Sequence, residues 1–340
     1  MTSKRSFLKL AGLTAALSLG LAANADAMDV TGAGATFPQA VYSKWAEAYK
    51  AASGNTVNYQ GIGSSGGIKQ IKARTVDFGA TDAALTESEL AQDHLVQFPA
   101  VMGAAVFVAN LQNVKSGELK LDGATAADIM RGAIAKWNDA RIVALNPGLK
   151  LAGDITLVHR SDGSGTTNLV TNYLAKQSVA FMRDVGAGKE VKWPGNSVGG
   201  KGNAGVAASV KKIVGAIGYA DYADAVKSGM DLIQLKNRDG QFVQPSVESF
   251  KAAAAGADFK HAPGLAPDLI DQHGKNAWPM VTATFILLHE KSPDLAKAKG
   301  VLDFFKWSFE NGAQMAADLS FVPLPENVTK LVEAEWHHVK

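Results

Sequence analysis

The chain has 340 residues, enough for two domains of ordinary size, and its hydrophobic fraction of 47% is sufficient for a large core. The formal net charge of +2 excludes a strongly basic nucleic-acid-binding protein and an acidic disordered one. The sequence contains no cysteine, which excludes a disulfide scaffold, a cysteine-ligated metal site, a thiol nucleophile and a lipid-anchoring cysteine. Glycine is in excess, because its 34 residues make up 10% of the chain and the average is about 7%. The positions of the glycines are therefore informative.

Residues 1–27 have the pattern of a cleaved secretory signal peptide. A basic start at residues 4–9 is followed by an apolar run over residues 10–23, and Ala25-Asp26-Ala27 fits a small-x-small cleavage site. The apolar run is too short and too rich in Gly and Ala for a spanning helix. Residues 3–9 are similar to a twin-arginine signal with Lys in place of one Arg, so the general and twin-arginine export routes both stay open. Cleavage would remove three basic residues and one acidic residue, so the mature chain would carry no net charge.

The mature chain alternates short apolar strands with amphipathic helices, which is typical of an α/β fold. The first helix is the clearest example, because Val41, Trp45, Ala48 and Tyr49 fall on one face and Pro38 occupies its first turn. In chain order, the expected elements are strand Val30–Ala33, helix Gln39–Ala51, strand Thr56–Gln60, helix Gly66–Ala73, one or two strands in Val96–Asn110, strand Ile155–His159, helix Thr166–Gln177, helix Val206–Ile213, strands Ala216–Tyr219 and Phe285–His289, and helices Leu295–Glu310 and Thr329–His337.

Metal and cofactor signatures are weak in this sequence. The seven histidines show no His-x-x-x-His spacing, and Asp77 and Asp82 bracket a tight segment instead of forming a cluster. We therefore expect no metal site and no cofactor.

Three glycine-rich turns each follow an expected strand and precede an expected helix. They are Gly32–Phe37, Gly61–Gly67 and Arg160–Thr166, and a fourth stretch, Gly199–Gly205, precedes the helix at Val206. A helix N-terminus leaves about four N–H groups unpaired and carries roughly half a positive charge. Glycine lets the backbone approach a ligand closely, and Ser or Thr adds hydroxyl donors. One such turn is an ordinary helix cap, but three in one chain favour an oxyanion site.

The charged residues near these turns are compatible with an anion that carries two negative charges. Three helix ends supply about +1.5 and Arg160 adds +1, which nearly balances hydrogen phosphate, and Asp162 is placed to orient Arg160. Asp82 would select the ligand, because a carboxylate can accept the proton of hydrogen phosphate, whereas sulfate has none to donate. The alternative is that Asp82 is a turn or cap residue in Thr81–Ala84.

Two enzyme-like patterns overlap the second turn. Gly61–Gly66 satisfies Gly-x-Gly-x-x-Gly with Asp82 near the expected offset, which is compatible with a dinucleotide-binding domain. Gly63–Gly67 satisfies the nucleophile-elbow pattern of an exported esterase, with Ser65 as the nucleophile. The following helix is short for the first class, and no His-Gly-Gly-Gly motif precedes Ser65 for the second. The turn at Gly163–Thr166 lacks the lysine of a P-loop.

The mature chain resembles the periplasmic phosphate-binding proteins of bacterial ABC phosphate importers over essentially its whole length. The stretches that carry the resemblance are Thr31-Gly-Ala-Gly-Ala-Thr-Phe-Pro38, Tyr59-Gln-Gly-Ile-Gly-Ser-Ser-Gly-Gly67, Asp77-Phe-Gly-Ala-Thr-Asp82, Asp162-Gly-Ser-Gly-Thr166, Gly215-Ala-Ile-Gly-Tyr219 and Ala277-Trp-Pro279. The resemblance implies a two-lobed, type II-like periplasmic binding protein made of two α/β sandwiches with a hinge and a ligand cleft between them. The chain would cross between lobes near Gly103 and Trp278, giving lobe one residues 28–103 and 278–340 and lobe two residues 104–277.

The resemblance also implies a set of ligand contacts and partners. The phosphate contacts would be Thr36, the Phe37 backbone N–H, Ser64, Asp82, Arg160, Ser164, Gly165 and Thr166, with Asp162 pairing with Arg160. The implied protein is a monomeric binder and not an enzyme, localised in the periplasm. Its partners would be inorganic phosphate and the membrane permease subunits of an importer with a cytoplasmic ATPase, with no nucleic acid.

Overall fold

A computed structural model describes residues 27–340 of the chain. The predicted signal peptide lies outside the described residues except for Ala27. Within the described range, no helix is long and apolar enough to cross a membrane.

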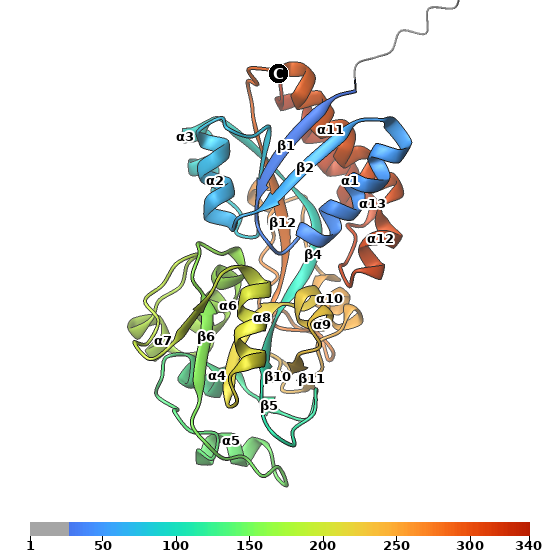
Figure 1. The fold of residues 1–340 in the computed structure, drawn as a ribbon. Coiled ribbons are helices and arrows are strands. Elements are labelled where there is room, and N and C mark those ends of the chain that lie inside the picture. Colours follow the sequence, from blue (N-terminus) through green and yellow to red (C-terminus); the bar gives the residue numbers. More distant parts are fainter. Residues whose placement is uncertain (1–26) are drawn as a thin grey trace, which may run out of the picture.

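The described chain forms two lobes, the upper and lower halves of Figure 1, in which strands are flanked by helices. The first lobe contains β1 (Asp29–Gly34), β2 (Thr56–Gly61), β3 (Phe78–Thr81), β12 (Val281–His289), α1 (Gln39–Ser53), α2 (Ser64–Lys72), α3 (Glu87–Asp93), α11 (Leu295–Asn311), α12 (Ala313–Asp318) and α13 (Glu326–Glu335). The second lobe contains β6 (Thr156–Arg160), β7 (Val198–Gly200), β8 (Ala216–Asp221), β9 (Asp231–Leu232), α4 (Gly123–Met130), α5 (Ala140–Leu145), α6 (Gly165–Gln177), α7 (Val179–Asp184), α8 (Gly202–Lys212), α9 (Tyr222–Lys227) and α10 (Val247–Ala254). It also carries a small sheet of β5 (Lys120–Leu121), β10 (Gln234–Lys236) and β11 (Phe242–Val243).

One strand, β4 (Leu95–Ala109), runs through both lobes, and all of its residues are buried. The strand order is β2-β1-β3-β12-β4-β8-β6-β7, with β9 also paired to β4. The part of β4 up to Ala104 pairs with β12, and the part from Ala105 pairs with β8. The segment expected to form one or two strands is therefore a single strand. It tolerates Pro99 because the register shifts between Thr284 and Phe285 of β12, opposite this proline.

The two chain segments that pass between the lobes lie side by side. The Ala105 N–H donates to the Met280 carbonyl at 3.0 Å, and the Trp278 indole Nε1–H donates to the Ala105 carbonyl at 2.9 Å. The Phe37 ring packs against Gly103 on the same strand and makes an edge contact with Phe321, with ring centroids 5.7 Å apart. The turn before α1 is thus anchored directly on the connection between lobes.

The expected elements are present, and several of their limits differ from those expected. Helix α8 begins at Gly202 and not at Val206, because its first turn lies inside the glycine-rich stretch. Strand β12 begins at Val281, four residues before the expected start, and α13 begins at Glu326 and ends at Glu335, before the expected end at His337. The shift of α8 has functional consequences, because it places Asn203 in the first turn of a helix.

Candidate functional site

The predicted glycine-rich turns meet at the seam between the two lobes. Among the described residues, three hydrogen bonds join these turns across the seam. The Gly165 N–H donates to Ser64 Oγ at 3.1 Å, the Ser65 N–H donates to the Gly163 carbonyl at 3.1 Å, and Asn203 Nδ2 donates to Thr36 Oγ1 at 3.2 Å. The N-termini of α2, α6 and α8 and the turn before α1 therefore surround one polar region.

Glycine is required where the turns approach each other most closely. Gly63 has a φ of 89°, which disfavours any other residue, and a Cβ there would lie 2.5 Å from an Asp162 carboxylate oxygen in the opposite lobe. A Cβ on Gly165 would lie 2.6 Å from both Ser64 Oγ and Asp82 Cβ. These two glycines allow the lobes to touch.

Arg160, the last residue of β6, is the buried cation of the site, with 4% of its surface exposed. Its Nε donates to Asp162 Oδ1 at 2.8 Å, its Nη2 donates to Asp162 Oδ2, and its Nη1 donates to Asn203 Oδ1 at 3.0 Å. Burial alone would raise the pKa of Asp162, but the hydrogen bonds and charge of Arg160 lower this pKa below its usual range. The expected pairing of Asp162 with Arg160 is thus present as a two-pronged ion pair.

This ion pair changes the charge balance derived from the sequence. Because Asp162 neutralises Arg160, the guanidinium is not an uncompensated positive charge. An anion at this seam would be held mainly by backbone N–H groups, hydroxyl groups and helix dipoles.

The hydroxyl and backbone donors of the site come from the first turns of helices. Ser164 Oγ caps α6 by accepting from the Thr167 N–H at 3.0 Å, and Ser64 Oγ accepts from the N–H groups of Asp82 and Gly165. Both hydroxyl groups retain a proton to donate. Thr166 is fully buried, and its Oγ1 has no hydrogen-bond partner among the described residues. Within residues 27–340, the Phe37 N–H also makes no backbone hydrogen bond.

Asp82 follows β3 and is 4% exposed. Its Oδ1 is buried without a partner among the described residues. Burial raises the pKa of Asp82 to about 7, against the opposing effects of the Thr284 hydroxyl, the Arg160 charge and the Ser64 hydroxyl. Thr81 Oγ1 donates to the Ala83 carbonyl and accepts from the Ala83 N–H, while Ser64 and Thr282 bond the backbone of Asp82 itself. The turn is therefore held by groups other than the Asp82 carboxyl group, which remains available for a ligand.

All nine residues expected at the site lie along this seam or directly behind it, but three of their neighbours were not anticipated. Asn203 bridges Arg160 and Thr36, Tyr219 OH accepts from the Arg160 N–H at 3.2 Å, and Thr284 acts on Asp82 from β12. The fourth glycine-rich stretch contained Asn203, so this residue had a sequence signal. Thr284 had none, because only the sheet order brings β12 beside β3.

The two enzyme-like patterns gain no support from the geometry. None of the hydrogen bonds described for residues 27–340 joins Ser65 Oγ to a histidine, as a nucleophile elbow requires. A dinucleotide-binding unit pairs the two strands that flank its helix, but here β1 lies between β2 and β3.

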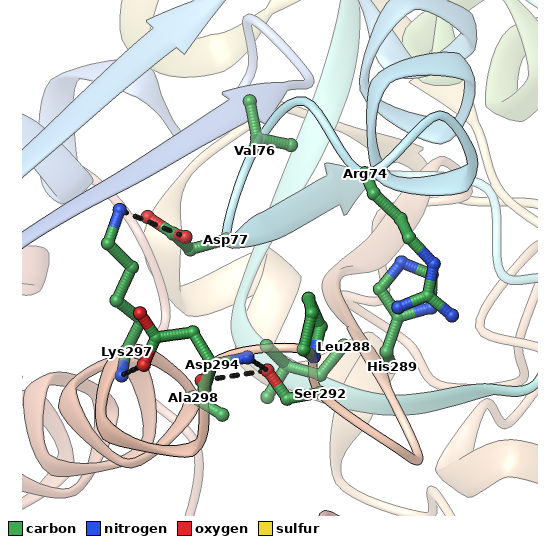
Figure 2. Close-up of a pocket in the computed structure, with 10 residues that line it drawn as sticks. Arg74, Val76, Asp77, Leu288, His289, Ser292, Asp294, Lys297 and Ala298 are labelled. Carbon is green, nitrogen blue, oxygen red and sulfur yellow. Dashed lines mark hydrogen bonds and ion pairs between the residues drawn. The ribbon is translucent and has the colours of Figure 1, made fainter.

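A second polar cavity lies at the opposite end of β3 (Figure 2). Its volume of about 50 Å³ has room for little more than water. Its charged side chains already have structural partners. Asp77 accepts from the Thr31 N–H and pairs with Lys297, while Asp294 caps α11. No cluster of three or more metal-ligating side chains occurs in the described part of the chain.

Two α/β lobes joined by adjacent segments, with a buried polar site between them, define the class of periplasmic binding proteins. The model of the PBP superfamily domain matches residues 21–311. The chain is 50% identical over 308 residues to the phosphate-binding protein PstS of Xylella fastidiosa strain 9a5c, covering 90% of this chain and 84% of that protein. It is 49% identical over 329 residues to the protein of the same name from Pasteurella multocida, covering 96% and 95%.

A solved structure has the same fold. The high-affinity periplasmic phosphate-binding protein PfluDING, determined with bound phosphate, matches with a TM-score of 0.73 at 22% identity, over 90% of this chain and 93% of that chain. The chain belongs to the PstS family of phosphate-binding proteins.

Proposed function

We propose that this chain binds inorganic phosphate between its lobes in the periplasm and delivers it to the membrane permease subunits of an ABC-type phosphate importer with a cytoplasmic ATPase. The names of its relatives support phosphate as the ligand. This role requires no bond to be made or broken, so the proposed protein is a binder and not an enzyme. We propose that it acts as a monomer.

The observation that carries this proposal is a pair of orphaned buried groups on opposite lobes. Asp82 Oδ1 and Thr166 Oγ1 are both buried without a partner among the described residues, and such groups are costly unless a ligand satisfies them. Phosphate supplies both partners, because its oxygens accept from the Thr166 hydroxyl and its proton can be donated to Asp82. The remaining contacts come from Thr36, the Phe37 N–H, Ser64, Arg160, Ser164 and Gly165.

The proposed lobes are residues 28–103 with 278–340, and residues 104–277. The change of β4 partner between Ala104 and Ala105 supports this division. The hydrogen bonds across the seam describe a closed arrangement, so phosphate would enter when the lobes separate. Closure would then replace its water shell with N–H groups, hydroxyl groups, Arg160 and the Asp82 acceptor.

Calorimetric titration of the mature chain tests the ligand. We expect saturable binding of phosphate and arsenate and much weaker binding of sulfate, because dianionic sulfate would face Asp82 without a proton to donate. Equal affinity for phosphate and sulfate, or no phosphate binding, would overturn the proposal.

The Asp82→Ala variant tests the acceptor. We expect phosphate affinity to fall by roughly 10- to 100-fold, since a hydrogen bond to a charged group is lost. Asp154→Ala is the matched control, because that carboxylate is exposed and forms a surface ion pair with Lys136. Wild-type affinity in Asp82→Ala would return Asp82 to a purely structural role.

A further inference from the structure

Asn203 forms hydrogen bonds to both lobes, although it is not among the proposed phosphate contacts. It lies in the first turn of α8 and is fully buried. Its Oδ1 accepts from Arg160 Nη1 at 3.0 Å within the second lobe, and its Nδ2 donates to Thr36 Oγ1 at 3.2 Å in the first lobe. One amide group thus joins the buried cation of one lobe to a hydroxyl group of the other.

The position of Asn203 is fixed from several directions. The Gly202 N–H donates to Asp162 Oδ1 at 3.0 Å, so the start of α8 is tied to the carboxylate that holds Arg160. Gly202 has a φ of 66° and lies against Thr36, with its Cβ position 3.5 Å from the Thr36 methyl group. A rigid helix end therefore presents the Asn203 amide to Thr36.

The hydrogen-bonding capacity of the two side chains gives Asn203 a directional effect. The Asn203 amide nitrogen is a donor, so Thr36 Oγ1 accepts from it, and the Thr36 hydroxyl proton must point elsewhere. An outer cleft of about 260 Å³ lies beside this contact, lined by Thr36, Gln39, Lys201 and Asn203 among others. Asn203 therefore stands between this outer cleft and the buried Arg160.

Building on the proposed function, we propose that Asn203 is a positioning residue that latches the closed form. Its amide nitrogen orients the Thr36 hydroxyl proton toward the bound phosphate, and its amide oxygen holds Nη1 of Arg160 in place. The contact to Thr36 crosses the seam, so it forms only when the lobes close. It therefore slows the release of phosphate and leaves its capture largely unchanged.

Stopped-flow measurement of phosphate association and dissociation tests this role with full-length mature protein. For Asn203→Ala, we expect the dissociation rate to rise roughly 10- to 100-fold, while the association rate changes less than about threefold. Asn172→Ala is the matched control, since Asn172 lies along α6 and its amide donates to the Asn168 carbonyl within the same helix. Thermal unfolding without phosphate checks that both variants fold, and Asn203→Ala should unfold at a lower temperature than Asn172→Ala because Arg160 Nη1 loses its partner within the second lobe. If Asn203→Ala does not fold, Asn203→Ser, which keeps a polar side chain in this turn, replaces it.

A double-mutant cycle with Thr36→Val separates the latch from general support of Arg160. If Asn203 acts through Thr36, adding Asn203→Ala to Thr36→Val should raise the dissociation rate by less than about threefold. If the effects of the two substitutions on the dissociation rate multiply, the residues act independently and the latch is overturned. A wild-type dissociation rate in Asn203→Ala would overturn it as well. These outcomes leave phosphate binding itself intact, whereas an absence of phosphate binding by the wild-type chain would overturn the proposed function.

Discussion

Asp82 combines a buried carboxyl group with an oxygen that has no protein partner among the described residues. Burial disfavours its charge, and Arg160 offsets this only in part, because Asp162 already neutralises the guanidinium. Without a ligand, such a carboxyl group lowers the stability of the closed form once it ionises. At the scale of single residues, the buried carboxyl group is therefore unfavourable in the closed form without a ligand. An anion that donates a proton to it removes this unfavourable free energy.

The pH dependence of stability follows from this residue. The folded-state pKa of about 7 lies above the unfolded value of 3.8, so the folded protein retains a proton that the unfolded chain releases between these values. Raising the pH from 5 to 8 should destabilise the closed arrangement of the phosphate-free wild type relative to that of Asp82→Asn, by up to roughly 2–3 kcal/mol. Urea unfolding of both proteins at the two pH values measures the difference. A stability difference that does not change with pH would contradict a raised pKa.

At the scale of elements, helix N-termini and the turns that precede them build the site. The first turn of α6 contributes its N-cap Ser164, the Gly165 N–H and the Thr166 hydroxyl, and the first turn of α2 contributes Ser64. Placing these groups at helix starts leaves their N–H groups without partners in the helix. The close approach of the two turns requires that Gly165, like Gly63, has no side chain.

Gly165→Ala tests this packing. A Cβ would lie 2.6 Å from Ser64 Oγ and Asp82 Cβ, so the turns must separate and the site must loosen. We expect phosphate affinity to fall at least tenfold, as measured by calorimetry. Gly195→Ala is the control, because its Cβ would meet open space. Equal affinities of the two variants would show that the close approach is not needed for binding.

At the scale of the whole molecule, the two lobes are held together at the seam by a small number of polar contacts. One apolar core is built largely on aromatic residues of α1 and α11, and a second is centred on β4, β8 and α6 and extends along β4 and β12 into the first lobe. The apolar contact between the lobes is therefore concentrated along β4 and β12, where the chain passes from one lobe to the other. A ligand that bonds to both lobes should shift the molecule toward the closed arrangement.

Small-angle scattering and thermal unfolding test this coupling. Saturating phosphate should reduce the radius of gyration and, at 100 times the dissociation constant, add about 2.7 kcal/mol to the stability of the closed form. This corresponds to a rise in melting temperature of at least a few degrees. Sulfate at the same concentration should do neither. An unchanged radius of gyration on phosphate binding would contradict a closing motion.

The order of strands and helices could be read from the sequence, because alternating apolar strands and amphipathic helices leave a periodic signal. The close approach of turns such as Gly61–Gly67 and Arg160–Thr166 had a local signal as well, since glycine marks places where backbone meets other atoms. The start of α8 at Gly202 had none, because a glycine-rich segment is a poor helix by its own propensity and is held here by its contacts to Asp162 and Thr36.

The sequence by itself therefore determined the fold class and the glycine-rich turns that gather at the seam, since both depend on local patterns of polarity, glycine and capping. The individual contact residues were implied by the resemblance to a known family. Only the tertiary structure decided how these residues are connected. It buried Asp82 beside Thr284 and set Asn203 between Arg160 and Thr36. The physical reason is that burial, pKa and hydrogen bonds across the seam depend on groups far apart in the chain, which only the packing of the two lobes brings together.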